Sequence, residues 1–308
     1  MKSFIKKILL IYSCLLLGVS GFSQQDPQYS LHMFNPLGVN PGYAGSREVL
    51  SAVIIHRSQW IGLEGAPETQ AFAINTPMKN KKMGIGLQII NDNIGPKTTQ
   101  LLKGTYAYRL KLGGGKLAFG LSGGIINYNY NWNKIEYKEQ DDAIPTSAAE
   151  GFIIPTFDFG VYYNTNTFYL GLSTEHINEA NYNLISIDTV NSRAKKYATS
   201  RLTVGKAFML SDQLILKTSF LFRASNTTGN VDFNSGLLFR NKFLLGFSLR
   251  RNTLILVTEM NLSKKLRLGL AYDFDASDVA NSSSGSIEFF LGYDVDLFKS
   301  KVVSPRYF

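Results

Sequence analysis

Only a few residues in this 308-residue sequence have types and spacing that could perform chemistry. Residues 120–124 read Gly-Leu-Ser-Gly-Gly, which matches the G-x-S-x-G pattern of serine hydrolases. That pattern requires its serine on a sharp turn between a strand and a helix. Ser122 instead follows Phe119 and Leu121 in a run where apolar residues alternate with small or polar ones. The run predicts a continuous strand, so we interpret the match as coincidental.

Residue types that bind metals are present, but their spacing does not predict a metal site. The three histidines are too far apart for zinc-ligand spacing. Three aspartates near a predicted loop are similar to a calcium loop, but the spacing and the missing glycine do not fit an EF-hand. These residues are His32, His56, His176, Asp273, Asp275 and Asp278. No nucleotide-binding motif occurs, so we expect no catalytic residue, no metal and no cofactor, and predict that the protein is not an enzyme.

The N-terminus has the composition of a secretory signal peptide. Three lysines stand among the first seven residues, and Ile8–Val19 is an apolar run too short to span a bilayer as a helix. We predict a signal peptide over residues 1–23, with cleavage before Gln24. Lipid attachment at Cys14, the only cysteine, is disfavoured because Tyr12 is bulky for a lipobox.

The formal net charge of +9 narrows the possible partners. A positive surface could favour anionic lipid or lipopolysaccharide, although a solvated surface explains the charge equally well. Nucleic acid is not an expected partner, because the basic residues are scattered along the chain rather than clustered. With its only cysteine in the leader, the mature chain is predicted to contain no disulfide.

From residue 48 onward, apolar residues alternate with polar or small ones, which predicts β-strands. In 266–274, for example, leucines and aromatics at even positions alternate with Arg267, Gly269 and Asp273. No later stretch sustains a helical pattern. The predicted strands lie at about 48–60, 68–76, 82–91, 98–111, 116–128, 153–164, 167–177, 196–208, 213–224, 230–240, 242–250, 252–262, 265–274 and 285–298.

The two faces of these strands differ in a way that favours a membrane. One face is almost uniformly apolar, as lipid contact requires, whereas the other carries charges of both signs that a wet barrel interior could accept. The charged residues expected in the lumen are Lys217, Arg223, Arg240, Arg250, Glu259, Arg267, Glu288 and Asp294. We therefore predict an all-β fold, a transmembrane antiparallel β-barrel of about 14 strands over residues 48–298, followed by a tail over 299–308. Glycines at 84–86, 120–124 and 269 predict close approach of another part of the chain.

The predicted connections support this topology. Tight turns are expected near residues 113, 165, 211, 241 and 263, and long loops over 129–152, 178–195 and 275–284. Short and long connections alternate from about residue 92, as in outer-membrane barrels with short periplasmic turns and longer outer loops. The short connection at 250–252 is an exception. A short helix is conceivable over 143–150.

Residues 24–47 do not fit a membrane-spanning strand. Prolines recur among aromatic residues, and proline cannot donate to a strand ladder. The segment could pack in the lumen as a plug or lie on the periplasmic rim. A disordered leader is the remaining alternative, against which the aromatic content argues.

This N-terminal sequence resembles the PorP/SprF family of type IX secretion system membrane proteins. The resemblance is carried by Gln25-Asp26-Pro27-Gln28-Tyr29-Ser30, Met33-Phe34-Asn35-Pro36 and Asn40-Pro41-Gly42-Tyr43-Ala44-Gly45-Ser46-Arg47. It continues in Arg57-Ser58-Gln59-Trp60, Gly65-Ala66-Pro67 with Thr69-Gln70, Asn91-Asp92-Asn93-Ile94-Gly95-Pro96, and Ser304-Pro305-Arg306-Tyr307-Phe308. Gly42, where Ala is expected, and Leu31-His32 depart from the usual pattern.

The resemblance implies an outer-membrane accessory of the type IX secretion system, localised to the bacterial outer membrane after signal-peptide-dependent export. Such a protein would assist export or surface anchoring of cargo proteins such as adhesins, as gliding motility requires. The implied partners are components of the secretion machinery, the secreted cargo, and outer-membrane lipid and lipopolysaccharide. The alternatives are a passive, porin-like transporter for small or hydrophobic solutes and a membrane-embedded hydrolase using Ser122.

Two groups of residues are candidate sites. The proposed partner-binding set is Asp26, Pro27, Gln28, Tyr29, Met33, Phe34, Asn35, Pro36, Asn40, Pro41, Tyr43 and Gly45, and the family-motif set is Arg57, Gln59, Trp60, Gly65, Ala66 and Pro67. In the first set, prolines would preorganise the chain and aromatics would supply contact area near the periplasmic mouth. The alternative is that these residues only seal the barrel.

Overall fold

The computed structural model describes residues 26–131, 151–187, 190–226 and 229–298. The predicted signal peptide over 1–23, the possible helix over 143–150 and the tail over 299–308 lie outside the described residues. No described helix is long and apolar enough to cross a membrane.

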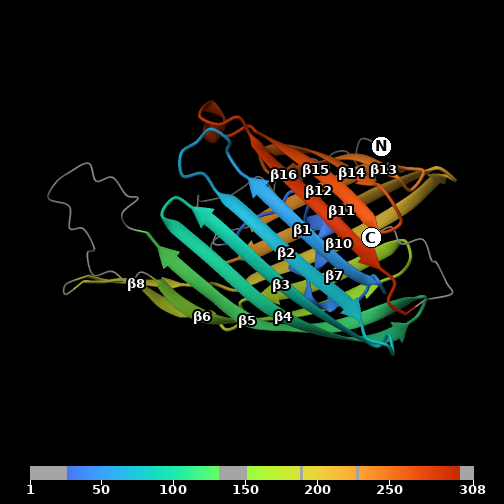
Figure 1. The fold of residues 1–308 in the computed structure, drawn as a ribbon, viewed down its shortest axis with the longest axis horizontal. Helices are drawn as coiled ribbons and strands as arrows, with labels where there is room; N and C mark the ends of the chain where they lie inside the picture. The colour runs from blue at the N-terminus through green and yellow to red at the C-terminus, as the bar shows by residue number, and fades with distance from the viewer. Residues whose placement is uncertain (1–25, 132–150, 188–189, 227–228, 299–308) are drawn as a thin grey trace, which may run out of the picture.

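Fourteen antiparallel strands close into a barrel, in which β1 pairs with both β2 and β16 (Figure 1). The predicted fold class is confirmed, and each of the fourteen predicted segments corresponds to a barrel strand. The strands are β1 (Leu50–Ser58), β2 (Glu68–Pro77), β3 (Met83–Ile94), β4 (Lys97–Leu112), β5 (Gly115–Tyr130), β6 (Gly151–Asn164), β7 (Phe168–Glu175), β10 (Thr199–Ser211), β11 (Leu214–Ser225), β12 (Gly229–Phe239), β13 (Phe243–Arg250), β14 (Thr253–Asn261), β15 (Leu266–Asp275) and β16 (Ser286–Val295).

A two-stranded hairpin of β8 (Asn181–Ile187) and β9 (Val190–Lys195) lies outside the barrel sheet. Residues 178–195 were predicted to be a long loop, so the hairpin is a correction. Its strands have only 7 and 6 residues, and the apolar residues of β8 do not keep a strict alternation, so the sequence did not indicate them. A further short 3₁₀ helix, η5 (Asp278–Asn281), lies in the connection before β16.

Connection length distinguishes the two ends of the barrel. At the end where β1 begins and β16 ends, here called the turn end, every connection between strands has two to five residues. The opposite end, the loop end, carries the long connections after β1, β5, β7 and β15. The predicted tight turns are confirmed. The predicted alternation holds less well, because the loop end also has short connections after β3, β11 and β13.

The strand faces divide as the alternation predicted. Side chains with outward parity are mostly exposed Leu, Ile, Phe and Tyr, whereas inward positions are mostly buried. The prediction that Arg240 faces the lumen is wrong, because this residue lies in the turn after β12 and is exposed there. It donates a hydrogen bond to Gln213 Oε1 at 2.9 Å, and its guanidinium lies 5.0 Å from the Phe239 ring centroid. The other charged side chains predicted to face the lumen do so.

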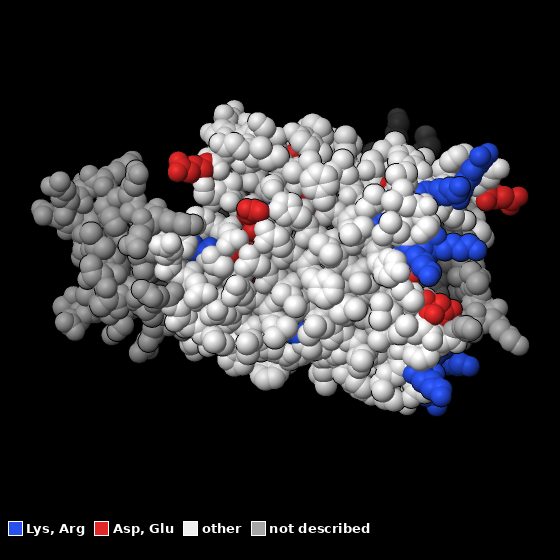
Figure 2. Space-filling model, viewed as in Figure 1, with Lys and Arg blue, Asp and Glu red and all other residues white. Residues whose placement is uncertain are grey.

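Polar rows mark the limits of the apolar wall. On β2 to β5, outward amides hydrogen-bond across strands, as in Asn91 Nδ2 donating to Gln70 Oε1 at 2.9 Å and Asn127 Nδ2 to Gln100 Oε1 at 3.3 Å. At the turn end the wall reaches exposed lysines such as Lys111. Between Gln100 and Lys111, β4 rises roughly 28 Å along the axis at an ordinary barrel tilt. This height matches a hydrocarbon core, and Figure 2 shows a broad, mostly uncharged band at this level.

We predict that a charge on the wall is tolerated only near these limits. Leu121, which is 59% exposed, lies midway along the outer face of β5. Leu121→Arg should lower the free energy of unfolding in vesicles by about 2–4 kcal/mol, because the guanidinium would lie near the bilayer midplane. Asn127→Arg, in the amide row of the same strand, is the matched control and should change it by less than about 1 kcal/mol. Urea titration of folding measures both. Equal effects would contradict this placement of the membrane.

Candidate functional site

Residues 26–46, here called the N-terminal segment, lie inside the barrel. The segment folds into three short 3₁₀ helices, η1 (His32–Phe34), η2 (Pro36–Gly38) and η3 (Pro41–Tyr43). Proline occupies the first position of η2 and η3, where its missing N–H has no helical partner to lose. Asn40 caps η3 by accepting a hydrogen bond from the Gly42 N–H at 2.8 Å. The prolines that exclude a membrane strand therefore shape a compact insert.

An ion cluster fixes the start of this segment to the barrel wall. We call it the Arg57 cluster; it joins Ser30, Arg57, Asp273 and Glu288, all of which are buried. The backbone N–H groups of Ser30 and Leu31 donate to the two carboxylate oxygens of Glu288 at 2.7 and 2.9 Å. The Arg57 guanidinium lies between Glu288, at 3.1 Å, and Asp273, at 2.7 Å. Two buried acids therefore share one arginine, while the segment donates its backbone N–H groups to Glu288 and the Ser30 hydroxyl to Asp273 at 2.8 Å.

A second cluster is built around Asp232. Arg250 donates to this buried carboxylate at 2.8–3.0 Å, and Arg223 also pairs with it. Arg250 additionally donates to the Tyr29 carbonyl at 2.7 Å, which ties the cluster to the segment. His32 Nδ1 lies 3.8 Å from Asp232. Burial lowers the pKa of His32 to about 3, so this histidine is neutral at pH 7.

A third cluster, near the loop end, contains a geometrically possible metal-ligand set. Ligand atoms of Asp26, Glu175 and His176 all lie within 4.8 Å of one another. However, the Lys196 ammonium is 2.5 Å from Asp26, and Arg201 is 2.5 Å from Glu175. A divalent cation would have to displace these ion pairs, so the residues present fit a third anchor for the segment better than a metal site.

Hydrogen bonds between side chains and backbone carbonyls hold the middle of the segment. The Asn40 amide donates to the carbonyls of Val161 and Leu172, at 2.9 and 3.2 Å, on the neighbouring strands β6 and β7. Ser173 Oγ donates to the Val39 carbonyl at 2.7 Å. These contacts place the segment directly against the wall, without space for a further layer of side chains.

Small residues in the wall make this close approach possible. A Cβ added at Gly120 would lie 2.2 Å from the Pro41 carbonyl carbon, and one at Gly84 would lie 2.0 Å from the Ala44 oxygen. The prediction that these glycines admit another part of the chain is confirmed. It is wrong for Gly124 and Gly269, whose added Cβ atoms would meet neighbouring strands or Phe290 instead.

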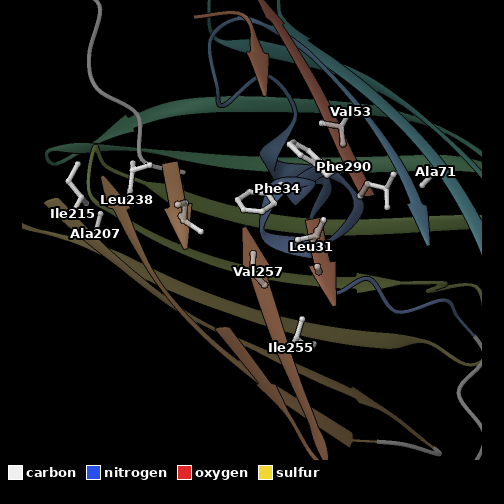
Figure 3. Close-up of a cluster of buried hydrophobic side chains, with 13 residues drawn as sticks. Leu31, Phe34, Val53, Ala71, Ala207, Ile215, Leu238, Ile255, Val257 and Phe290 are labelled. Carbon is white, nitrogen blue, oxygen red and sulfur yellow. The ribbon is translucent and has the colours of Figure 1, made fainter. Parts of the chain in front are cut away.

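Apolar packing completes the contact. Leu31 and Phe34 are buried among side chains of the wall, with the Phe34 ring centroid 5.2 Å from that of Phe290 (Figure 3). Tyr43 packs edge-on against Tyr162 at 5.5 Å. The largest side chains of the segment are thus used to fill the barrel interior.

Among the described residues, small chambers lie on both sides of the segment. One, about 60 Å³, faces the turn end and is lined by residues such as Met33, Pro36 and Arg47. The other, also about 60 Å³, faces the loop end and is lined by Asp26, Tyr29 and others. The two share no lining residue. Each holds only a few water molecules, so the interior is largely filled with protein.

The structure places every residue of the proposed partner-binding set in this segment, and none of them is exposed. Asp26, Pro27, Gln28, Tyr29, Met33 and Pro36 are half-buried, and Phe34, Asn35, Asn40, Pro41, Tyr43 and Gly45 are buried. In this conformation their contacts are with the barrel. A partner would reach the half-buried residues only from a chamber or after movement of the segment.

The family-motif residues divide between two places. Arg57 belongs to the cluster that holds the segment. The others, Gln59, Trp60, Gly65, Ala66 and Pro67, shape the connection between β1 and β2 at the loop end. There the Gln59 N–H donates to the Pro67 carbonyl at 2.9 Å, and Trp60 and Gly65 have positive φ of 52° and 70°. This connection exposes Ile61 and Leu63.

Sequence analysis did not identify the anchoring acids Asp232 and Asp273 as a site. Both have inward parity on their strands, which was the available signal. Asp232 meets Arg223 and Arg250 on the two neighbouring strands, whereas Asp273 meets Arg57, which is 216 residues away in the chain. Asp273 was instead considered as part of a loop. Ser122 faces inward within β5 and exchanges a hydrogen bond with Thr105 at 2.7 Å. This geometry does not resemble the turn of a hydrolase.

Comparison with known proteins gives one family match. The profile described as "Type IX secretion system membrane protein PorP/SprF" matches residues 21–293. No curated protein sequence matches the chain.

Several solved outer-membrane barrels are similar in structure. The toluene transporter TbuX of Ralstonia pickettii is 11% identical over 84% of this chain and 92% of its own, with a TM-score of 0.49. The toluene transporter TodX of Pseudomonas putida is 11% identical over 84% and 93%, with a TM-score of 0.48. The outer membrane protein Omp33 of Acinetobacter baumannii is 8% identical over 80% and 98%, with a TM-score of 0.45.

We predict that a side chain at Gly120 displaces the N-terminal segment. In Gly120→Val the added atoms would overlap the Pro41 backbone, and the free energy of unfolding should fall by about 1–3 kcal/mol. Protease should then cleave the segment faster in the folded barrel. The matched control is Gly104→Val, where the nearest atom to an added Cβ is 3.9 Å away. Equal protease resistance of the two variants would contradict the close contact between the segment and the wall at Gly120.

We also predict that acid lowers the free energy of unfolding because His32 is buried in its neutral form. Its folded pKa of about 3 lies below the ordinary value of 6.5, so the unfolded state takes up a proton first as the pH falls. The free energy of unfolding is therefore unaffected by this histidine above pH 6.5. Below pH 6.5 it falls progressively, and the loss is roughly 2–3 kcal/mol at pH 4.5. Urea unfolding at pH 7 and pH 4.5 measures it, and His32→Gln should remove this part of the pH dependence. An unchanged pH dependence in the variant would contradict the assignment.

Proposed function

Because the chain belongs to the PorP/SprF family of type IX secretion system membrane proteins, we propose that it is a non-enzymatic outer-membrane accessory of that system. In this role it assists the export or surface anchoring of cargo proteins such as adhesins. It reaches the outer membrane after signal-peptide-dependent export. Its partners are components of the secretion machinery and the cargo.

The filled interior is the observation that supports this role over transport. The three ion clusters and the wall glycines hold the N-terminal segment across the lumen. The chambers beside it among the described residues are small, with volumes of about 60, 60 and 40 Å³. A barrel filled in this way is suited to act through its surfaces. It is poorly suited to pass a solute, and still less an unfolded polypeptide, through its centre.

Two surfaces of the chain are suited to partners. The loop-end connection carrying the family motif exposes Ile61 and Leu63, apolar side chains outside the membrane-spanning wall. At the turn end, Met33 and Pro36 of the N-terminal segment line a chamber and remain half-buried. Preorganised proline and aromatic residues at that mouth lower the entropy that a partner must remove on binding.

Passive transport of small or hydrophobic solutes is the alternative function. It would require the N-terminal segment to leave the lumen, which would break its hydrogen bonds with Glu288 and Arg250. Stable conductance of the purified protein in planar bilayers would favour this alternative. We expect none.

The proposed role is tested by export in living cells. We predict that deletion of the gene leaves cargo in the periplasm and that the wild-type chain restores its appearance at the surface. Replacement of Tyr29, Phe34 and Tyr43 by Ala should reduce export several-fold while the barrel still assembles, because these side chains pack against the wall and fix the position of the half-buried residues that a partner would contact. Surface labelling of cargo measures export, and heat-modifiability on gels measures assembly.

The control for this experiment is Asn241→Ala, in an exposed turn after β12, which should export normally. Normal export by the deletion strain would remove the proposed function. Normal export by the triple variant, with normal assembly, would leave the family role in place and remove only the contact surface.

A further inference from the structure

The exposed charges of the barrel are distributed unequally between its ends. Basic side chains gather at the turn end, as seen at the right of Figure 2. We call this set the basic rim; it comprises the exposed residues Lys79, Lys82, Lys111, Lys206, Arg240, Lys242, Lys264 and Lys265. Among the described residues, the exposed acids at this end are Asp212 and Asp296.

The loop end has no comparable concentration of positive charge among the described residues. Its exposed charged side chains there are Glu64, Glu68 and Arg251. Among the residues that the structure describes, exposed positive charge is therefore concentrated at the turn end. A uniformly solvated surface would not require this separation.

The height of the basic rim places it in the headgroup layer of a membrane. The connections at this end have only two to five residues, so they extend a few ångströms beyond the apolar wall. A headgroup layer is about 5–7 Å thick on each side of the hydrocarbon. Lys206 has outward parity on β10, and its ammonium lies 5.1 Å from the Phe208 ring centroid toward the turn end. This is the course of a lysine that extends from an apolar wall to the interface.

The distribution of the rim around the barrel distinguishes lipid from a protein partner. The connections after β2, β12 and β14 each carry rim residues, Lys111 lies beside the connection after β4, and Lys206 pairs in register with Phe168 beside the connection after β6. A protein docking from one side would contact only part of this ring. An annulus of lipid contacts all of it.

We propose that the basic rim is a binding surface for the phosphate headgroups of anionic phospholipids in the leaflet at the turn end. The lysines supply positive charge at headgroup height, and Phe208, Phe239 and Phe243 supply apolar and aromatic contact just below it. In a barrel with periplasmic turns this leaflet is the inner one, which consists of phospholipid. The surface would favour phosphatidylglycerol and cardiolipin over zwitterionic lipid.

The experiment measures lipid selectivity of the refolded barrel in nanodiscs. Spin-labelled phosphatidylglycerol and phosphatidylcholine are compared for the fraction immobilised by the protein. We expect the wild type to prefer phosphatidylglycerol about fivefold at low salt, with the preference shrinking in high salt as the charges are screened. The variant Lys79→Gln/Lys82→Gln/Lys242→Gln/Lys264→Gln/Lys265→Gln should lose most of the preference. Arg251→Gln at the loop end is the control and should retain it.

Every replaced side chain is exposed, and heat-modifiability verifies that each variant is folded. No preference in the wild type, or an equal preference in the five-residue variant, would overturn the proposal. The variant could instead lose the ability to bind an acidic periplasmic protein while its lipid preference stays unchanged. That result would assign the rim to a protein partner and would also overturn the proposal. Because the assay contains no secretion component, its outcome is independent of the proposed function.

Discussion

A charge buried inside a barrel is costly unless an opposite charge or several hydrogen-bond donors lie beside it. Here this requirement determines where the N-terminal segment lies. Glu288 is satisfied by Arg57 and by two backbone N–H groups of the segment, and Arg250 divides its donors between Asp232 and the Tyr29 carbonyl. If the segment were removed, the wall would retain acids and arginines with incomplete partners. The segment and the wall are therefore one stable unit rather than a barrel with a loose insert.

The outer face obeys the opposite requirement, since lipid can satisfy no polar group. Its side chains are apolar between the amide row on β2 to β5 and the basic rim at the turn end. The two limits differ in chemistry, because one consists of neutral amides and the other mainly of lysines. The two ends of the barrel thus differ in side-chain chemistry as well as in the length of their connections, and they present different surfaces to lipids and proteins.

The alternation of residue types predicted all fourteen barrel strands, because each strand is exposed to lipid on one side and to a wet interior on the other. The same parity placed Glu288 and Arg250 in the lumen correctly. It could not reveal the partner of Glu288, because Arg57 is 231 residues away in the chain and meets Glu288 only through the register of the closing strands. Arg240 was misplaced because it lies just beyond the end of its strand, where parity no longer determines direction. Which glycines face the segment depends on contacts that local sequence does not encode.

The separation of the anchors along the chain has a consequence for the order of assembly. Ser30 belongs to the first part of the barrel protein to be synthesised, yet its backbone donates to Glu288, 258 residues later. Glu288 lies on the final strand, which also closes the sheet against β1. Contacts between such distant residues form late, after much chain entropy has been lost. The segment therefore cannot complete its contacts until the last hairpin has formed. Until then its aromatic residues are exposed, and this is the stage of assembly at which a chaperone would be most needed.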